Sequence, residues 1–148
     1  MAVAGTERHK LIGDVHLLLI DQQGRVLFGR RVNTGYEDGA YHLPSGHLEA
    51  GESMVAALVR EAKEEIGLTI SAEAVRFAHV MHNSSSGGRV AFFFLVQDWD
   101  GDPENMEPDK CDDLAWFSVK ALPDRMIAYC REAMQHIAAE RQFSLYGW

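Results

Sequence analysis

The sequence of 148 residues contains 22 acidic and 14 basic side chains, so its formal net charge at pH 7 is −8. This charge argues against binding to nucleic-acid backbones, which requires clustered Lys and Arg, but not against a small polyphosphate that arrives with Mg²⁺. No apolar stretch reaches the ~20 residues of a membrane helix, and the start of the chain does not resemble a secretory signal. We therefore expect a cytoplasmic protein of one domain, residues 1–148, whose cysteines, Cys111 and Cys130, stay reduced.

The first part of the chain predicts two strands and a loop. Leu11–Ile20 and Arg25–Arg31 have the apolar composition of strands, and Asp21–Gly24 is typical of the turn between them. Asn33–Ala40 is rich in Gly, Asn and Asp, which predicts a loop. The next segment, Gly46–Leu68, predicts a helix that follows a tight loop.

The second part of the chain predicts three more strands and a second helix. The expected strands are Val75–His82, Arg89–Trp99 and Leu114–Phe117, and the expected helix is Leu122–Arg141. An acidic loop, Asp98–Asp113, precedes the last strand. Strands that alternate with two helices favour a mixed sheet covered on both faces. The final residues, Ser144–Trp148, have no assigned role, and surface packing and dimer contact both remain open.

The first helix combines an apolar stripe with a group of acids. Five apolar side chains share one face at 3.6 residues per turn: Val55, Leu58, Val59, Ala62 and Ile66. Glu61, Glu64 and Glu65 project together from a different side. Glu61 and Glu65 repel each other at i and i+4, and the helix dipole disfavours anions near this end. A divalent cation would turn that repulsion into coordination, whereas without one these acids would be an ordinary solvated helix face.

Residues around the helix favour a ligand site over a solvated face. Gly46 and Gly51 bracket a tight loop that is suited to close approach of a ligand. Arg60 and Glu52 are two turns apart, so we expect them to pair and to brace the loop against the helix. Gly67 is placed to end the helix as a left-handed C-cap.

These residues resemble the Nudix box. Its pattern is Gly, five residues, Glu, seven residues, Arg-Glu, an apolar residue, any residue, Glu-Glu, any residue, Gly and an apolar residue. The chain matches every fixed position with Gly46, Glu52, Arg60, Glu61, Ala62, Glu64, Glu65, Gly67 and Leu68. Tyr41–Pro44 resembles the short strand that leads into the box, and Leu114–Phe117 resembles a late strand of MutT-like members. One position departs, because many members carry a second glycine where this chain has Ser45.

The resemblance implies an α/β/α sandwich with a central mixed sheet and the catalytic loop and helix of the box. It also implies an Mg²⁺ cofactor, with Mn²⁺ able to replace it. The implied metal ligands are Glu61, Glu64, Glu65, the backbone of Ser45 and Glu107, with Glu64 and Glu65 as the principal ones. Glu52 and Arg60 join the box acids as catalytic residues. Asp112 and Asp113 compete with Glu107 for the place of the late acid.

The resemblance also suggests where substrate would bind. MutT-like relatives use an arginine near Arg31 for phosphate, although an exposed strand end is the alternative. Because adjacent strand residues face opposite sides, we expect at most one of Arg30 and Arg31 to reach the cleft. Gly46 and His47, in the box loop, are expected near phosphate, and His42 at a strand or pocket wall. Five aromatic residues are candidates for base stacking or for the core: Tyr36, Phe92, Phe94, Trp99 and Trp116.

We therefore expect an Mg²⁺-dependent pyrophosphohydrolase that acts on a nucleoside diphosphate linked to another group. A (deoxy)nucleoside triphosphate, cleaved to monophosphate and pyrophosphate, is the leading substrate. A nucleotide-sugar or ADP-ribose pyrophosphatase is the alternative of the same class. A non-catalytic nucleotide-sensing or protein-binding module is the alternative of another class, and the complete set of box acids disfavours it. The expected partner is a small nucleotide or another diphosphate, bound by a monomer or homodimer.

Overall fold

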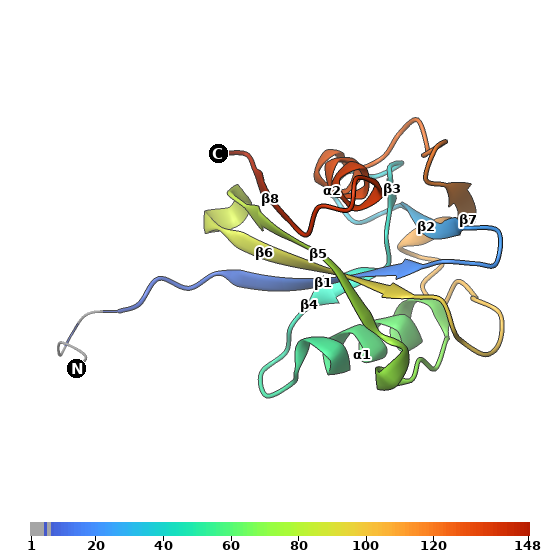
Figure 1. Ribbon diagram of the computed structural model, residues 1–148, viewed down its shortest axis with the longest axis horizontal. Coiled ribbons are helices and arrows are strands. Elements are labelled where there is room, and N and C mark those ends of the chain that lie inside the picture. Colours follow the sequence, from blue (N-terminus) through green and yellow to red (C-terminus); the bar gives the residue numbers. More distant parts are fainter. Residues whose placement is uncertain (1–4, 6) are drawn as a thin grey trace.

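A five-stranded sheet with a helix on each face forms the centre of the computed structural model, which describes Gly5 and residues 7–148 (Figure 1). The strands are β1 (Ile12–Leu19), β2 (Arg25–Arg31), β3 (Tyr41–His42), β4 (Ser45–His47), β5 (Arg76–Asn83), β6 (Arg89–Val96), β7 (Cys111–Ser118) and β8 (Phe143–Tyr146). The α-helices are α1 (Met54–Ile66) and α2 (Ala128–Ala138). Within the described residues, neither helix has the length and apolar composition needed to span a membrane.

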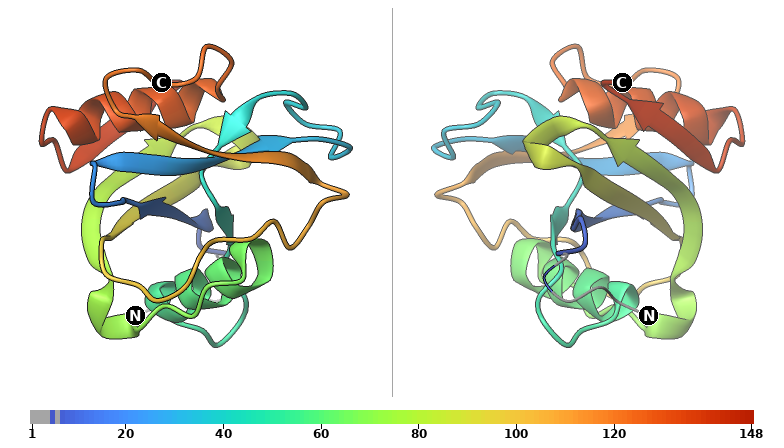
Figure 2. Two further views of the ribbon diagram at one scale, coloured as in Figure 1. Left: turned by 90° about the vertical axis from the view of Figure 1, so that its right-hand side faces the viewer. Right: turned by 90° about the vertical axis from the view of Figure 1, so that its left-hand side faces the viewer.

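The five-stranded sheet is mixed. Its strand order is β4-β1-β6-β5-β8. β1 runs parallel to β6 and β5 runs parallel to β8, while the pairs β1–β4 and β5–β6 are antiparallel. Figure 2 shows α1 and α2 on opposite sides of the strands. This arrangement confirms the expected α/β/α sandwich with a central mixed sheet.

Two apolar clusters, one on each face of the sheet, hold these layers together. Along β1, Val15, Leu17 and Leu19 pack with the cluster that contains the buried side of α1. Leu18 points the other way and packs with the cluster that contains α2. The alternation follows from the two-residue period of a strand, and burying each such leucine stabilises the fold by roughly 1.5–3 kcal/mol.

Helix α1 begins and ends at residues that satisfy its terminal backbone groups. The Ser53 side chain accepts a hydrogen bond from the Ala56 N–H, which caps the first turn. Gly67 has φ 70° and donates its N–H to the Lys63 carbonyl, so the predicted left-handed C-cap is confirmed. The buried face consists of Ala57, Leu58, Ala62 and Ile66, whereas Val55 and Val59 of the predicted stripe are only half-buried. The acidic side chains of the box therefore project from a helix whose position is fixed.

A second sheet, which the sequence did not predict, lies beside the first. It is antiparallel, with the order β3-β2-β7. The chain leaves β1 through a turn, where Ile20 and Val26 form an isolated bridge, and β2 then pairs along its length with β7. The register between β2 and β7 shifts between Arg30 and Arg31, because Asp112 is an extra residue in β7 that has no partner in β2.

Two predicted boundaries in the second half of the chain are wrong. The loop expected over Asp98–Asp113 is shorter, because β7 already begins at Cys111 and pairs with β2. The helix expected over Leu122–Arg141 is only Ala128–Ala138. The stretch before it is extended, since Ile127 donates its N–H to the carbonyl of Tyr41 in β3. Apolar spacing over a short segment does not separate such a buried extended stretch from a helical turn.

The C-terminal residues form β8, the edge strand of the central sheet, which was not predicted. The Ser144 hydroxyl donates to His79 Nε2 at 2.7 Å, and His79 Nδ1 donates to the Arg141 carbonyl at 2.6 Å. Trp148 Nε1 donates to the His82 carbonyl at 3.1 Å. Of the two readings left open for this segment, packing on the molecule's own surface is therefore observed. Both cysteines are free, as expected.

Acid is expected to weaken the attachment of β8. Burial lowers the pKa of His79, and nearby His136 acts in the same direction, while the hydrogen bond to the Arg141 carbonyl opposes them. Because the folded-state pKa lies below the unfolded value of about 6.5, this stabilisation is complete above pH ~6.5 and is lost as the pH falls toward the folded pKa. Urea unfolding at about pH 7.5 and about pH 5 would measure the loss.

The His79→Gln variant is expected to lose less stability between these two pH values than the wild type does. His136→Gln, which changes the partly exposed neighbour, serves as the control and should keep most of the pH dependence. An equal pH dependence in His79→Gln and in the wild type would contradict the assignment to His79.

Candidate active site

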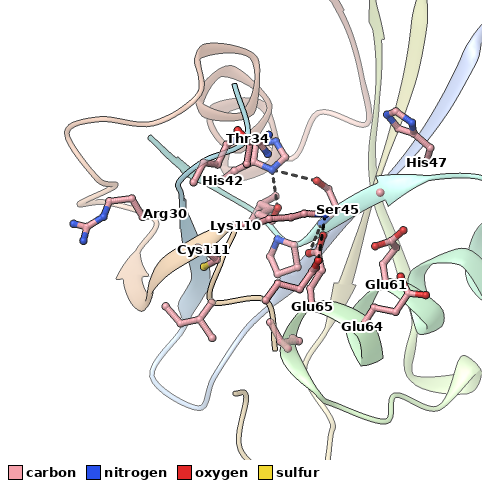
Figure 3. A pocket seen from close by; sticks show the side chains of 18 residues that line it. Arg30, Thr34, His42, Ser45, His47, Glu61, Glu64, Glu65, Lys110 and Cys111 are labelled. Atoms are coloured by element: carbon pink, nitrogen blue, oxygen red, sulfur yellow. Dashed lines mark hydrogen bonds and ion pairs between the residues drawn. The ribbon is translucent and has the colours of Figure 1, made fainter. Parts of the chain in front are cut away.

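A cavity of about 400 Å³ brings together most of the residues predicted for the site (Figure 3). The predicted residues that line it are Arg31, Ser45, Gly46, His47, Glu61, Glu64, Glu65 and Glu107. His42 also lines it, as expected for a pocket wall. Glu52 and Arg60 lie behind these residues. The cavity thus joins the end of β2, the β3–β4 segment, α1 and the loop before β7.

Arg60 connects the box loop to the acidic side of α1. Its Nε and Nη2 donate to the two carboxylate oxygens of Glu52 at 3.0 and 2.7 Å, so the predicted pair is observed. Its Nη1 donates to Glu61 at 2.8 Å and to Glu64 at 3.3 Å. Its Nη2 also donates to the His47 carbonyl at 3.1 Å. One guanidinium therefore positions three carboxylates and the loop backbone, which the planar fork of arginine makes possible.

The acids of the box differ in environment. Burial raises the pKa of Glu65 to about 8, and the nearby Glu61 adds to this shift, while the Ser45 N–H, which donates to Glu65 at 3.0 Å, opposes it. Burial also raises the pKa of Glu61, against the effect of Arg60. Hydrogen bonds from Arg60 and from the Glu49 N–H lower the pKa of Glu52. Arg60 thus favours the charged form of Glu52, whereas burial disfavours the charged form of Glu65.

The donor set fits a hard divalent cation, although the carboxylates are not yet gathered around one point. Within the described part of the chain, no three His, Cys, Asp or Glu side chains are arranged to hold a metal ion. Glu61 and Glu64 both accept from Arg60 Nη1. Figure 3 shows that Glu65 instead turns toward Ser45. Each carboxylate uses one oxygen in these bonds, so each retains an oxygen of the kind that Mg²⁺ prefers.

The three candidates for the late acid, Glu107, Asp112 and Asp113, differ in their contacts. Glu107 lines the cavity, whereas its two competitors form hydrogen bonds elsewhere. Asp112 accepts from Arg30 Nε at 2.7 Å, and Asp113 accepts from the Tyr41 hydroxyl at 2.5 Å. Of these three acids, Glu107 is therefore the one placed near the box.

Both arginines at the end of β2 contribute atoms to the cavity wall, but their guanidinium groups lie in different places. The register shift beside them comes from an extra residue, Asp112, in the facing strand β7. Arg31 lies 5.4 Å over the Tyr36 ring and donates to the Tyr36 carbonyl. Arg30 points away from the carboxylates in Figure 3 and pairs with Asp112.

Comparison with known proteins assigns the family. The NUDIX domain family matches residues 10–137, which is most of the chain. This chain belongs to the NUDIX family. This chain is 26% identical over 140 residues to an RNA pyrophosphohydrolase of Gluconacetobacter diazotrophicus. The match covers 80% of this chain and 84% of that protein. It is also 28% identical over 105 residues to an ADP-ribose pyrophosphatase of Methanocaldococcus jannaschii. That match covers 71% of this chain and 61% of the relative.

A solved structure agrees with this assignment. The MutT NUDIX hydrolase from Burkholderia pseudomallei matches with a TM-score of 0.76 at 25% identity, over 85% of this chain and 97% of that chain. The protein is therefore an enzyme that hydrolyses diphosphate linkages, as its family and its relatives indicate. Nudix hydrolases generally use divalent metal cations.

Gly46 is the box position that tolerates no side chain. A Cβ on Gly46 would lie 2.0 Å from the Glu61 carboxylate oxygen. We expect Gly46→Ala to displace Glu61 and to lower turnover by about 100-fold, the scale of a small misplacement in an active site. The melting temperature should change little, because the displaced group is the end of a flexible side chain. Turnover and thermal unfolding of the purified variant would test this.

Gly13→Ala is the matched control for this variant. Its Cβ would meet the end of the Leu48 side chain at 2.8 Å and no carboxylate. The control should keep wild-type turnover. If Gly46→Ala retained turnover as well, the contact with Glu61 would not matter for catalysis.

Several residues near the box were not predicted from the sequence. Arg89, at the start of β6, donates from Nε and Nη2 to the two oxygens of Asp14 at 2.8 Å each. Its Nη2 also approaches His47 Nε2 at 2.7 Å. In the sequence, Gly13 and Asp14 interrupt the apolar run Leu11–Ile20, and nothing there gives Asp14 a role. The parallel pairing of β1 with β6, which brings Asp14 beside Arg89, is not visible in local sequence.

Proposed function

We propose that this Nudix hydrolase is an Mg²⁺-dependent pyrophosphohydrolase that cleaves a nucleoside diphosphate linked to another group. One observation carries the proposal: acidic and basic side chains line a single cavity. The acids are Glu61, Glu64, Glu65 and Glu107, and the bases are Arg31 and Lys110. Carboxylates suit the cation, while guanidinium and ammonium groups suit the phosphate oxygens that the cation leaves uncovered.

In this proposal some box residues bind the cation and others hold those ligands in position. Glu64 and Glu65 are the principal ligands, assisted by Glu61, Glu107 and the backbone at Ser45, and Mn²⁺ can replace Mg²⁺. When bound, the cation polarises a phosphoryl group, neutralises the leaving phosphate and acidifies a water molecule. Arg60 and Glu52 keep Glu61 and the box loop in position.

The substrate end of the cavity supports a phosphate-binding role for Arg31. It stands across from the box acids, and its guanidinium is held by the Tyr36 ring and carbonyl. Gly46 and His47 supply the loop on the other side. A fixed arginine would hold the phosphate chain against the box acids that would bind the cation, so that the substrate is positioned before hydrolysis.

The leading substrate is a (deoxy)nucleoside triphosphate, cleaved to monophosphate and pyrophosphate. A nucleotide sugar or ADP-ribose is the second candidate, because another cavity adjoins the first and offers room for a second sugar. A relative is named for ADP-ribose. All box acids are present, which favours catalysis over a purely sensing or scaffolding module.

A mixed substrate panel with Mg²⁺ would test the proposal. It should contain ordinary and oxidised deoxynucleoside triphosphates, ADP-ribose, a nucleotide sugar and a short RNA with a 5′-triphosphate. We expect nucleoside monophosphate and pyrophosphate from the triphosphates, with little single phosphate. If only ADP-ribose or the nucleotide sugar yields a monophosphate, the reaction class holds and the substrate assignment fails. If no member of the panel is cleaved, the catalytic proposal fails.

A further inference from the structure

A second cavity, of about 480 Å³, adjoins the one that holds the box acids. The two cavities share Arg31, His42, Ser45, Gly46 and His47, so a diphosphate at the box lies at their junction. The remaining walls come from β1, the end of β5, the turn after it, the start of β6 and α2. A volume of this size suits one end group of a small substrate.

The hydrogen-bond acceptors of this second cavity are already engaged. Both carboxylate oxygens of Asp14 accept from Arg89 at 2.8 Å. His47 Nε2 lies 2.7 Å from Arg89 Nη2 and so accepts from it. Asn83, which is 4% exposed, uses its Oδ1 to accept from the Ser85 N–H at 2.9 Å. Each of these acceptor atoms therefore already faces a donor of the protein.

A buried chain at the back of the cavity uses further acceptors. His42 Nδ1 donates to the Leu43 carbonyl at 2.7 Å, so its Nε2 accepts from the Tyr129 hydroxyl at 2.6 Å. The Tyr129 oxygen then accepts from His16 Nε2 at 2.9 Å. This leaves His16 Nδ1 as an acceptor with no partner among the described residues, but that atom is buried behind the wall and does not face a ligand.

The donors of the second cavity, in contrast, remain open. Within the described residues, no hydrogen bond uses Arg89 Nη1, Asn83 Nδ2 or the two terminal nitrogens of Arg31. Tyr36, which is 53% exposed, adds an aromatic surface beside them. Arg89 is held by two bonds to Asp14 and Asn83 by its bond to Ser85, so these donors are fixed in direction before a ligand arrives.

From these open donors we infer that the second cavity receives the group attached to the diphosphate and selects groups that present oxygen acceptors, with Arg89 and Asn83 as the residues that donate hydrogen bonds to them. The inference rests on the proposed function and specifies its substrate class. Two kinds of group have this chemistry. One is a nucleobase that presents a carbonyl where adenine and cytosine present an amino group, and the other is a phosphorylated sugar.

The test compares substrates that differ in this one property. With Mg²⁺, kcat/KM is measured for GTP and UTP, for ATP and CTP, and for 5-phosphoribosyl 1-diphosphate. We expect GTP and UTP, or the phosphorylated sugar, to exceed ATP and CTP by about 10-fold or more, as expected for one hydrogen bond to a charged donor. The first outcome identifies a carbonyl-bearing base and the second a sugar phosphate. Equal values across the panel would overturn the inference.

Two variants test the residues. Asn83→Asp keeps the oxygen that accepts from Ser85 but replaces the open amide donor by an acceptor, so the ratio of GTP to ATP turnover should fall by about 10-fold. Arg89→Lys keeps a positive charge beside Asp14 but loses the planar set of guanidinium donors. The KM for the substrate that carries the preferred group should therefore rise while kcat changes little. Arg25→Lys is the matched control, because Arg25 forms a comparable pair with Asp21 in a surface turn.

Binding without turnover separates this inference from the proposed function. Calorimetric titration of the metal-free protein with GMP, AMP and ribose 5-phosphate measures the second cavity alone. If the wild type cleaves no substrate yet binds GMP or ribose 5-phosphate more tightly than AMP, and Asn83→Asp loses that difference, the proposed function fails and the cavity assignment stands. If cleavage proceeds but Asn83→Asp and Arg89→Lys leave every ratio unchanged, only the cavity assignment fails.

Discussion

Replacing Glu65 or Glu64 by Gln is expected to lower turnover by about two to three orders of magnitude, the scale on which a lost electrostatic contact to a transition state acts. Each change removes one charged oxygen from the set proposed to hold Mg²⁺ while the side-chain shape is kept. The Mg²⁺ concentration needed for half-maximal rate should rise as well. Steady-state rates over a magnesium titration would measure both effects.

The same variants are expected to keep their stability without metal. Glu65 is buried close to Glu61, and the Ser45 N–H can donate to a Gln oxygen as it does to Glu65. Burial, together with the nearby Glu61, already disfavours the charged form of Glu65 by raising its pKa to about 8, so a neutral Gln suits the same surroundings. Glu73→Gln, at an exposed acid that lies outside the box sequence and does not line the cavity, is the control for both measurements. Wild-type turnover in both box variants would overturn the ligand assignment, and a clear drop in the metal-free melting temperature would overturn this account of their stability.

Arg60→Ala is expected to lower both stability and turnover. The guanidinium has a side-chain exposure of only 23% and bonds to Glu52, Glu61 and Glu64, so its removal leaves three nearby carboxylates without a cation. The box loop also loses its bond at the His47 carbonyl. We expect turnover to fall by about 100-fold, as when catalytic groups are misplaced, and the melting temperature to fall by several degrees.

Thermal unfolding and steady-state kinetics of Arg60→Ala would separate two roles of this residue. Arg25→Ala, which removes the Arg25–Asp21 pair of the surface turn, is the control and should keep wild-type turnover. A variant that melts like the wild type and differs only in a raised KM would mean that Arg60 contacts substrate phosphate instead of supporting the box.

The parts of the fold that follow from local chemistry were predictable. The spacing of Leu58, Ala62 and Ile66 predicted the buried face of α1, and Gly67 predicted its end. The distance of two helical turns predicted the pair between Arg60 and Glu52. In each case the interacting residues lie close in sequence, so helix geometry alone relates them.

The parts that depend on distant pairing were not predictable. β8 is short, and it is a strand because β5 offers an edge to it. The second cavity exists because the parallel pairing of β1 with β6 brings Asp14 beside Arg89. The register shift opposite Arg30 and Arg31 comes from an extra residue in β7, which the local sequence of β2 does not indicate. Sequence periodicity reports which face of an element is apolar, and it does not report which element will cover that face.

Arg60 acts as a built-in counter-ion for the helix that carries the box acids. A positive charge from the same chain already neutralises part of the repulsion among these acids, through bonds to Glu61 and Glu64. The chain can therefore complete its fold before a divalent cation binds, and binding would then only require the carboxylate ends to regroup. Chelators should then stop the enzyme without unfolding it, unlike small domains whose metal ligands come together only when the metal binds.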